Sequence, residues 1–223
     1  MVQVASAIAR PSFSLVGSVY EVALTQAGFR HVAGADEAGR GACAGPLVAA
    51  AVILGDSVPD GLNDSKKLTP RRREQVFAEI SDTAVAFAWV SVPPADCDAL
   101  GMQSADLGAL RDAILALDPA PDFAVTDGFA VPGLKCPSLG MWKGDQVVAC
   151  VAAASIVAKV VRDRMMVTLD AEYPGYGFAV HKGYATQSHQ AALDALGPCP
   201  QHRLTYRNVA ATLPGMDHTE SIV

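Results

Sequence analysis

The 223-residue sequence lacks an apolar run long enough to cross a membrane. A transmembrane helix needs roughly 18 uninterrupted apolar residues. Residues 42–54 are broken by Gly45 and Pro46, and residues 147–161 contain Lys159. The N-terminus also lacks the basic segment that precedes the apolar part of a secretory signal. We therefore expect a cytoplasmic protein with no membrane partner.

Closely spaced cysteines are also missing. The chain has five cysteines, which is an odd number, and no two of them form a C-x-x-C pair. This pattern argues against a zinc ribbon and against a disulfide scaffold. We expect all of them to be reduced thiols: Cys43, Cys97, Cys136, Cys150 and Cys199.

The sequence has no excess of basic charge, which at first disfavours a nucleic-acid partner. Its formal net charge is −6 at pH 7. Surface charges are screened beyond about 8 Å at physiological salt, so a local basic face matters more than the total. Carboxylates gathered at a metal site would also contribute to the negative total. A nucleic-acid partner therefore remains open.

With 51% hydrophobic and 18% charged residues, the composition fits one folded domain with a sizeable core. We predict an N-terminal segment over 1–28 that ends in a helix near 19–27, one domain over 29–213, and a flexible tail over 214–223. Predicted strands and helices are interspersed, which favours an α/β sandwich.

Apolar stretches rich in β-favouring residues predict strands at 29–36, 46–54, 84–92, 123–126 and 138–142. The first two read as a hairpin joined by a glycine-rich turn. Helix signals predict helices from Thr69-Pro70, over 95–118, from Asp145, and between Thr186 and Gly197.

Four acids fall at the ends of these elements. Asp36 and Glu37 end the first strand, Asp127 ends a later one, and Asp145 opens a helix. Two like charges about 4 Å apart repel by roughly 4 kcal/mol at an effective dielectric near 20, so such a cluster needs cations. Hard oxygen ligands suit Mg²⁺ or Mn²⁺. Two such ions roughly 3.5–4 Å apart suit phosphodiester hydrolysis.

Each acid also has a plain structural interpretation when it is taken alone. An aspartate at a strand end is usually a turn former, and Asp145 is most simply a helix N-cap. The residues around the acids decide between the two interpretations.

Residues 33–41, AGADEAGRG, resemble the first motif of the bacterial type 2 ribonuclease H (ribonuclease HII) family. Further motifs of that family follow in order, and the resemblance covers about 29–209. These motifs are LNDSKKL at 62–68, TDG at 126–128, KGD at 143–145, VAAASIVAKVVRD at 151–163, YGF at 176–178, HKGY at 181–184 and HR at 202–203.

This resemblance implies an RNase H-like fold, with a central mixed β-sheet flanked by helices and a C-terminal helical extension. It also implies an endoribonuclease that hydrolyses the RNA strand of RNA/DNA hybrids. On DNA duplexes containing ribonucleotides it would incise on the 5′ side of the ribonucleotide, leaving 3′-hydroxyl and 5′-phosphate ends, as ribonucleotide excision repair requires. Asp36, Glu37, Asp127 and Asp145 would bind two Mg²⁺ or Mn²⁺ ions.

The resemblance also assigns substrate contacts. The turn Gly39, Arg40, Gly41 would bring backbone amides to the 2′-hydroxyl, the group that distinguishes RNA from DNA. Tyr184 would pack against the sugar of the next nucleotide and sense the junction.

Phosphate contacts are expected from Lys66, Lys67 and Lys182, and these would position the duplex without reading its sequence. The roles of Ser155, His181 and His202 stay open.

Three alternatives fit the sequence less well. A type 3 enzyme would need an extra N-terminal domain, for which the 28 residues ahead of the match are too few. Another metal-dependent nuclease of the same fold would have no use for a turn and tyrosine that sense a 2′-hydroxyl. A non-catalytic nucleic-acid-binding module would not need all four acids. We expect the enzyme to be a monomer.

Overall fold

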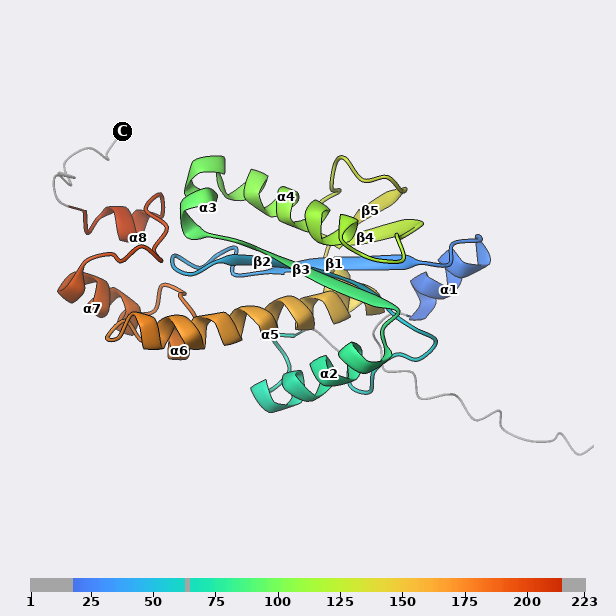
Figure 1. The fold of residues 1–223 in the computed structure, drawn as a ribbon, viewed down its shortest axis with the longest axis horizontal. Helices are drawn as coiled ribbons and strands as arrows, with labels where there is room; N and C mark the ends of the chain where they lie inside the picture. Colours follow the sequence, from blue (N-terminus) through green and yellow to red (C-terminus); the bar gives the residue numbers. More distant parts are fainter. Residues whose placement is uncertain (1–17, 63–64, 214–223) are drawn as a thin grey trace, which may run out of the picture.

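The computed structural model describes residues 18–62 and 65–213 (Figure 1). The predicted tail over 214–223 lies outside this range, as do residues 1–17 of the predicted N-terminal segment. Asn63 and Asp64 of the predicted basic loop are outside it as well. Within the described residues, no helix combines the length and apolar character needed to cross a bilayer.

A five-stranded mixed sheet forms the centre of the molecule, in the order β3-β2-β1-β4-β5. Strands β1, β2 and β3 pair antiparallel, whereas β4 runs parallel to β1 and β5 runs parallel to β4. The predicted hairpin and the predicted mixed α/β sheet are therefore confirmed. The strands are β1 (Val32–Ala38), β2 (Leu47–Ile53), β3 (Ala86–Val92), β4 (Phe123–Asp127) and β5 (Ser138–Met141).

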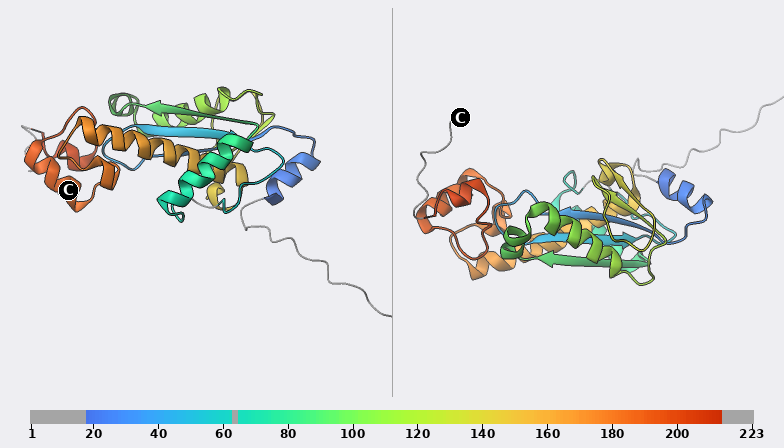
Figure 2. Two further views of the ribbon diagram at one scale, coloured as in Figure 1. Left: turned by 60° about the horizontal axis from the view of Figure 1, so that its bottom comes forward. Right: turned by 90° about the horizontal axis from the view of Figure 1, so that it is seen from above.

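Helices cover both faces of the sheet, with α4 on one side and α5 and α2 on the other (Figure 1). The short helices α6, α7 and α8 gather at one end of the sheet, which is the predicted C-terminal helical extension (Figures 1 and 2). The helical elements are α1 (Ser18–Gln26), α2 (Pro70–Thr83), α3 (Pro94–Leu100), α4 (Met102–Leu115), the 3₁₀ turn η1 (Gly144–Gln146), α5 (Ala149–Glu172), α6 (Phe178–His181), α7 (Gln187–Leu196) and α8 (Arg207–Ala210).

Small residues bring α5 very close to β1. A Cβ atom on Gly34 of β1 would lie 2.1 Å from the carbonyl carbon of Cys150, so only glycine fits there. Ala152, Ala153 and Ala154 are fully buried against the same side of the sheet. This close packing fixes the helix relative to β1, and it thereby fixes the parts of the molecule that carry the acids.

The region predicted to be helical over 95–118 is confirmed but is divided into two helices, because Gly101 between them has a left-handed φ of 76°. One predicted helix start is wrong. Asp145 does not open the long helix: it lies in η1, and α5 begins only at Ala149. By contrast, the predicted cap at Thr69 is confirmed, since its hydroxyl accepts a hydrogen bond from the Arg72 amide at 3.2 Å.

Candidate metal centre

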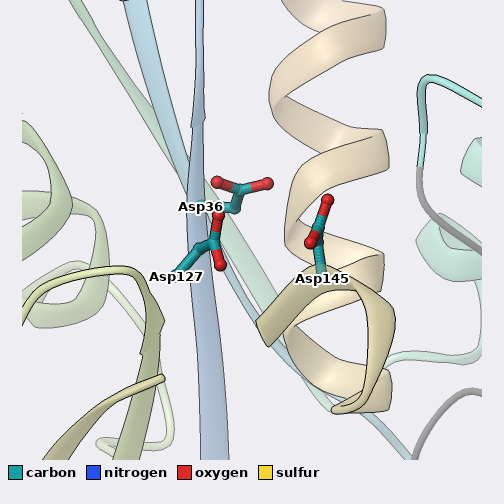
Figure 3. Close-up of side chains that lie close together, drawn as sticks. All are labelled: Asp36, Asp127 and Asp145. Carbon is teal, nitrogen blue, oxygen red and sulfur yellow. The ribbon is translucent and has the colours of Figure 1, made fainter. Parts of the chain in front are cut away.

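Three aspartates converge beside the sheet: Asp36 from β1, Asp127 from β4 and Asp145 from η1 (Figure 3). Each of them offers a carboxylate oxygen within 4.8 Å of the others. The pairing of parallel strands explains the first two. Ala35 of β1 pairs with Thr126 of β4, so the next residue on each strand projects to the same side.

The third aspartate is held by its turn. Lys143 has a left-handed φ of 57°, which turns the chain back after β5. The next amide, that of Gly144, donates a hydrogen bond of 2.6 Å to Oδ1 of Asp127. One acid of the cluster therefore anchors the turn that carries another, Asp145.

The electrostatics of the cluster favour a cation. Burial raises the pKa of Asp36 well above its usual range, and the nearby charges of Glu37 and Asp127 raise it further. The Glu37 amide donates to Oδ1 of Asp36 at 2.8 Å, and Ser155 also bonds this carboxylate, which partly offsets the rise in pKa. The site offers only hard oxygen donors, the set that Mg²⁺ and Mn²⁺ prefer. The donor chemistry therefore fits these ions.

Glu37 lies beside the three aspartates but is not one of the mutually close group. Its Oε1 is 3.9 Å from Nη1 of Arg40, and the same nitrogen lies 3.3 Å from Oδ2 of Asp106. Burial raises the pKa of Glu37 to about 7, with Asp106 adding to the rise and Arg40 opposing it.

Asp106, on α4, was not predicted as part of the site. It is buried, and burial raises its pKa to about 6 against the opposing effect of Arg40. The sequence does hold a signal for it, because Asp106 falls in the same helical row as the core residues Leu110 and Ala113. A carboxylate in an apolar row indicates a buried partner.

A cleft of about 190 Å³ opens next to the aspartates. It brings together most of the residues predicted from sequence as metal ligands or substrate contacts. Its lining is Asp36, Glu37, Ala38, Gly39, Arg40, Gly41, Ser65, Lys66, Ser155, Lys159 and Tyr184.

Two predicted phosphate contacts do not line this cleft. Lys182 lies by a separate groove between α2 and α5, and its Nζ donates to the Ala179 carbonyl at 2.7 Å. Lys67 is exposed and follows Lys66 in the chain.

The two glycines of the turn after β1 differ in why they must be glycine. Gly39 has a φ of 89°, and a Cβ there would lie 1.9 Å from Nε of Arg162, so the fold itself requires glycine. A Cβ on Gly41 would meet nothing closer than Cε1 of Tyr184 at 4.0 Å. Packing does not require glycine at 41, where the backbone faces the cleft.

Comparison with known proteins accords with this geometry. The family model for ribonuclease HII matches residues 33–209. The chain belongs to the ribonuclease HII family. It is 60% identical over 193 residues to ribonuclease HII of Cutibacterium acnes, covering 85% of this chain and 95% of that protein. It is 58% identical over 199 residues to that of Salinispora arenicola, covering 87% of this chain and 74% of that protein.

The crystal structure of ribonuclease H2 from Pyrococcus horikoshii OT3 superposes with a TM-score of 0.71 at 26% identity, covering 82% of this chain and 97% of that one. The predicted family and RNase H-like fold are therefore confirmed. So is the predicted enzyme class, a metal-dependent ribonuclease H that hydrolyses phosphodiester bonds. Family and fold together support endoribonuclease activity on RNA/DNA hybrids.

Arg162 is fully buried and supports the residues around the cleft. The sequence did not lead us to expect this role. Arg162 of α5 donates to the carbonyls of Ala44 at 3.0 Å, Pro46 at 2.9 Å and Lys182 at 2.9 Å, and its guanidinium lies 5.7 Å from the Tyr184 ring centroid. It ties the segment after β1 to the segment that carries Tyr184.

A second buried arginine, Arg203, acts on the same turn. It donates to the Arg40 carbonyl at 3.0 Å and to the Gly45 carbonyl at 2.9 Å. The C-terminal helical extension thus holds the Gly-Arg-Gly turn directly.

The histidines whose roles stayed open, His181 and His202, do not line the cleft. Nε2 of His189 lies 3.0 Å from Nε2 of His202, and its Nδ1 lies 3.0 Å from the Tyr184 carbonyl. His181 stacks on His189 with ring centroids 4.2 Å apart. Burial, with the nearby His189 adding to the effect, lowers the pKa of His202 to about 4. This network supports the segment that bears Tyr184.

Proposed function

We propose that this protein hydrolyses the RNA strand of RNA/DNA hybrids and incises duplex DNA on the 5′ side of an embedded ribonucleotide. The observation that carries the proposal is the convergence of Asp36, Asp127 and Asp145 beside a cleft that also holds Gly41 and Tyr184. Acids of this kind suit phosphodiester chemistry, and the turn and tyrosine suit the recognition of a ribose.

In this proposal Asp36, Asp127 and Asp145, with Glu37 beside them, hold two Mg²⁺ or Mn²⁺ ions. Ions bound there would lower the pKa of a water and stabilise charge on the departing 3′-oxygen. Hydrolysis would leave 3′-hydroxyl and 5′-phosphate ends. The protein's own contribution is a rigid set of carboxylates, held by the sheet and by the hydrogen bond between Gly144 and Asp127.

Substrate recognition is proposed to depend on the backbone of Gly39, Arg40 and Gly41. The open space at Gly41 lets a ribose approach the turn, where amide and carbonyl groups can bond its 2′-hydroxyl. Tyr184 is 41% exposed, so its ring is available to pack against the neighbouring sugar.

Lysines around the cleft are proposed to bind phosphates. Lys66 lines the cleft itself, and Lys67 follows it on an exposed segment. For Lys182 to contact a phosphate, its ammonium must give up its hydrogen bond to the Ala179 carbonyl. We also propose that residues 29–213 form one catalytic domain, because Arg203 bonds the turn after β1 from the C-terminal extension.

The test is incision of a labelled DNA duplex that carries one ribonucleotide, with Mn²⁺ present and an all-DNA duplex of the same sequence as the control. We expect a single nick immediately 5′ of the ribonucleotide, with a 3′ end that a DNA polymerase extends. The all-DNA duplex should stay intact. The absence of a nick with folded protein would refute the proposal.

A further inference from the structure

Two exposed aromatic side chains lie at the ends of the strands next to the acid cluster. Phe129 follows β4 and is 49% exposed, and Trp142 follows β5 and is 78% exposed. Trp142 is the most exposed aromatic side chain among the described residues. One exposed apolar residue needs no explanation, but two large rings beside a candidate active site do.

Hydrogen bonds and close packing hold the ends of β4 and β5, which these two residues follow, side by side. Asp127 pairs with Met141, and the Gly128 amide donates to the Met141 carbonyl at 2.8 Å. A Cβ on Gly140 would lie 2.5 Å from the carbonyl carbon of Phe129, so the two strand ends are packed backbone to backbone. Trp142 directly follows Met141 in the chain.

The strand order places this pair across the acid cluster from Tyr184. The cleft that contains Tyr184 is built on β1 and α5, whereas Phe129 and Trp142 follow β4 and β5. Asp127, at the end of β4, lies between the two sides.

Cations accompany the rings. The Arg40 guanidinium lies 5.5 Å from the Phe129 ring centroid, which connects the Gly-Arg-Gly turn to this side. Lys143 follows Trp142, is exposed, and makes no ion pair within the described part of the chain. Its left-handed φ of 57° is one that side-chain-bearing residues adopt rarely.

Aromatic rings beside cations are the combination that binds a nucleic-acid backbone without reading its sequence. Each ring can pack against a base or sugar, and each cation can pair with a phosphate. A protein partner would also use exposed aromatics, but the adjoining cations favour a polyanion.

We propose that Phe129, Trp142 and Lys143 form a second nucleic-acid contact, on the side of the metal centre away from Tyr184. This inference rests on the proposed function. The rings pack against sugars or bases of the bound duplex beyond the cleavage site, and Lys143 binds a phosphate. Duplex substrates then contact the protein on both sides of the acids, which helps to hold the scissile phosphate over them.

The first test measures binding of a fluorescein-labelled RNA/DNA hybrid by anisotropy, in an Asp36→Asn background so that the substrate stays intact. Trp142→Ala should raise Kd about ten-fold, the size of one lost aromatic contact, and Phe129→Ala should raise it by a similar factor. The matched control is Trp89→Ala on β3, at the opposite edge of the sheet, where the ring is 45% exposed. This control should change Kd less than about two-fold, since it removes no contact.

An unchanged Kd in Trp142→Ala would overturn the inference and leave the pair as a surface for a protein partner. A lower thermal midpoint in Trp142→Ala than in the control variant would point instead to a structural role. Cleavage by the wild-type protein is measured first. If it cleaves while Trp142→Ala binds normally, only this inference fails; if it does not cleave, the proposed function fails.

The second test uses fluorescence, because Trp89 and Trp142 are the only two tryptophans of the chain. With Asp36→Asn retained, Trp89→Phe leaves Trp142 as the sole reporter. Addition of unlabelled hybrid should quench or shift its emission, and the same addition to Trp142→Phe should leave the emission of Trp89 unchanged. If the emission of Trp142 does not change at a saturating concentration of hybrid, the proposed contact is contradicted.

Discussion

Replacement of Asp36 by asparagine should stabilise the metal-free protein while it removes a metal ligand. The three aspartates place carboxylate oxygens within 4.8 Å of one another. Asparagine has nearly the same shape, and its side-chain oxygen can still accept the hydrogen bond from the Glu37 amide. The substitution therefore removes charge with little change in packing.

The expected magnitude follows from the distances. Two unit charges 4.8 Å apart repel by about 3.5 kcal/mol at an effective dielectric near 20, and Asp36 takes part in two of the three pairs. Part of this repulsion is already relieved, because burial and the neighbouring acids raise the pKa of Asp36 so that it tends to hold a proton. We expect a net gain of about 1–2 kcal/mol, or roughly 2–8 °C in Tm for a domain of this size.

The assay is thermal unfolding of both proteins with and without Mn²⁺. At ten times Kd, binding stabilises a folded protein by about 1.4 kcal/mol, so the wild-type Tm should rise and that of Asp36→Asn should respond much less. Asp82→Asn, an exposed position on α2, serves as the control and should behave like wild type. A metal-free Asp36→Asn protein less stable than wild type would refute the reasoning, as would an equal response of both proteins to Mn²⁺.

The remaining predictions concern the cleft and its support. Tyr184→Ala should reduce cleavage at a single embedded ribonucleotide more than cleavage within a long hybrid, and equal losses in the two assays would reject junction sensing. Gly41→Ala should slow cleavage about ten- to a hundred-fold at an unchanged Tm, because it fills open space at the cleft. Gly39→Ala should lower the free energy of unfolding in urea by about 1–3 kcal/mol, because a Cβ there meets Arg162 and φ is 89°. A Gly41→Ala protein that loses stability, or a Gly39→Ala protein that loses cleavage but no stability, would contradict these roles. His202 binds a proton in the unfolded chain below about pH 6.5 but in the folded protein only near pH 4, so the free energy of unfolding should fall by about 3 kcal/mol as the pH drops through that window. A pH profile that His202→Gln leaves unchanged would rule this out.

Features with local signals were predictable from the sequence. The cap at Thr69 and the end of α7 at Gly197 depend on neighbouring residues only, and both are confirmed. Two of the acids were predictable for a related reason, since they belong to recognisable apolar strands that pair in parallel. Asp127 ends β4 as predicted, whereas β1 continues past Asp36 to Ala38. Their convergence needed only the rule that adjacent parallel strands present equivalent positions to one side.

Features that depend on distant partners were not predictable. Arg162 is fully buried because it bonds carbonyls 116 and 118 residues away, whereas an arginine on a helix is ordinarily expected at the surface. Asp145 lies in a 3₁₀ turn because the Gly144 amide bonds Asp127, a tertiary contact that overrides its local character as a helix cap. Asp106 carried a local signal, but its partner Arg40 is 66 positions away in the sequence.

The measurement that tests the metal centre most directly is cleavage of an RNA/DNA hybrid as Mn²⁺ is titrated, with wild-type protein and Asp127→Asn compared. We predict cleavage by wild type that depends on Mn²⁺ and stops in EDTA. Asp127→Asn, folded as judged by its Tm, should cleave more than about 100-fold more slowly than wild type. This loss exceeds the one expected for a residue that only supports a metal ligand. Cleavage by Asp127→Asn at the wild-type rate, or by wild type in EDTA, would contradict the assignment of these aspartates.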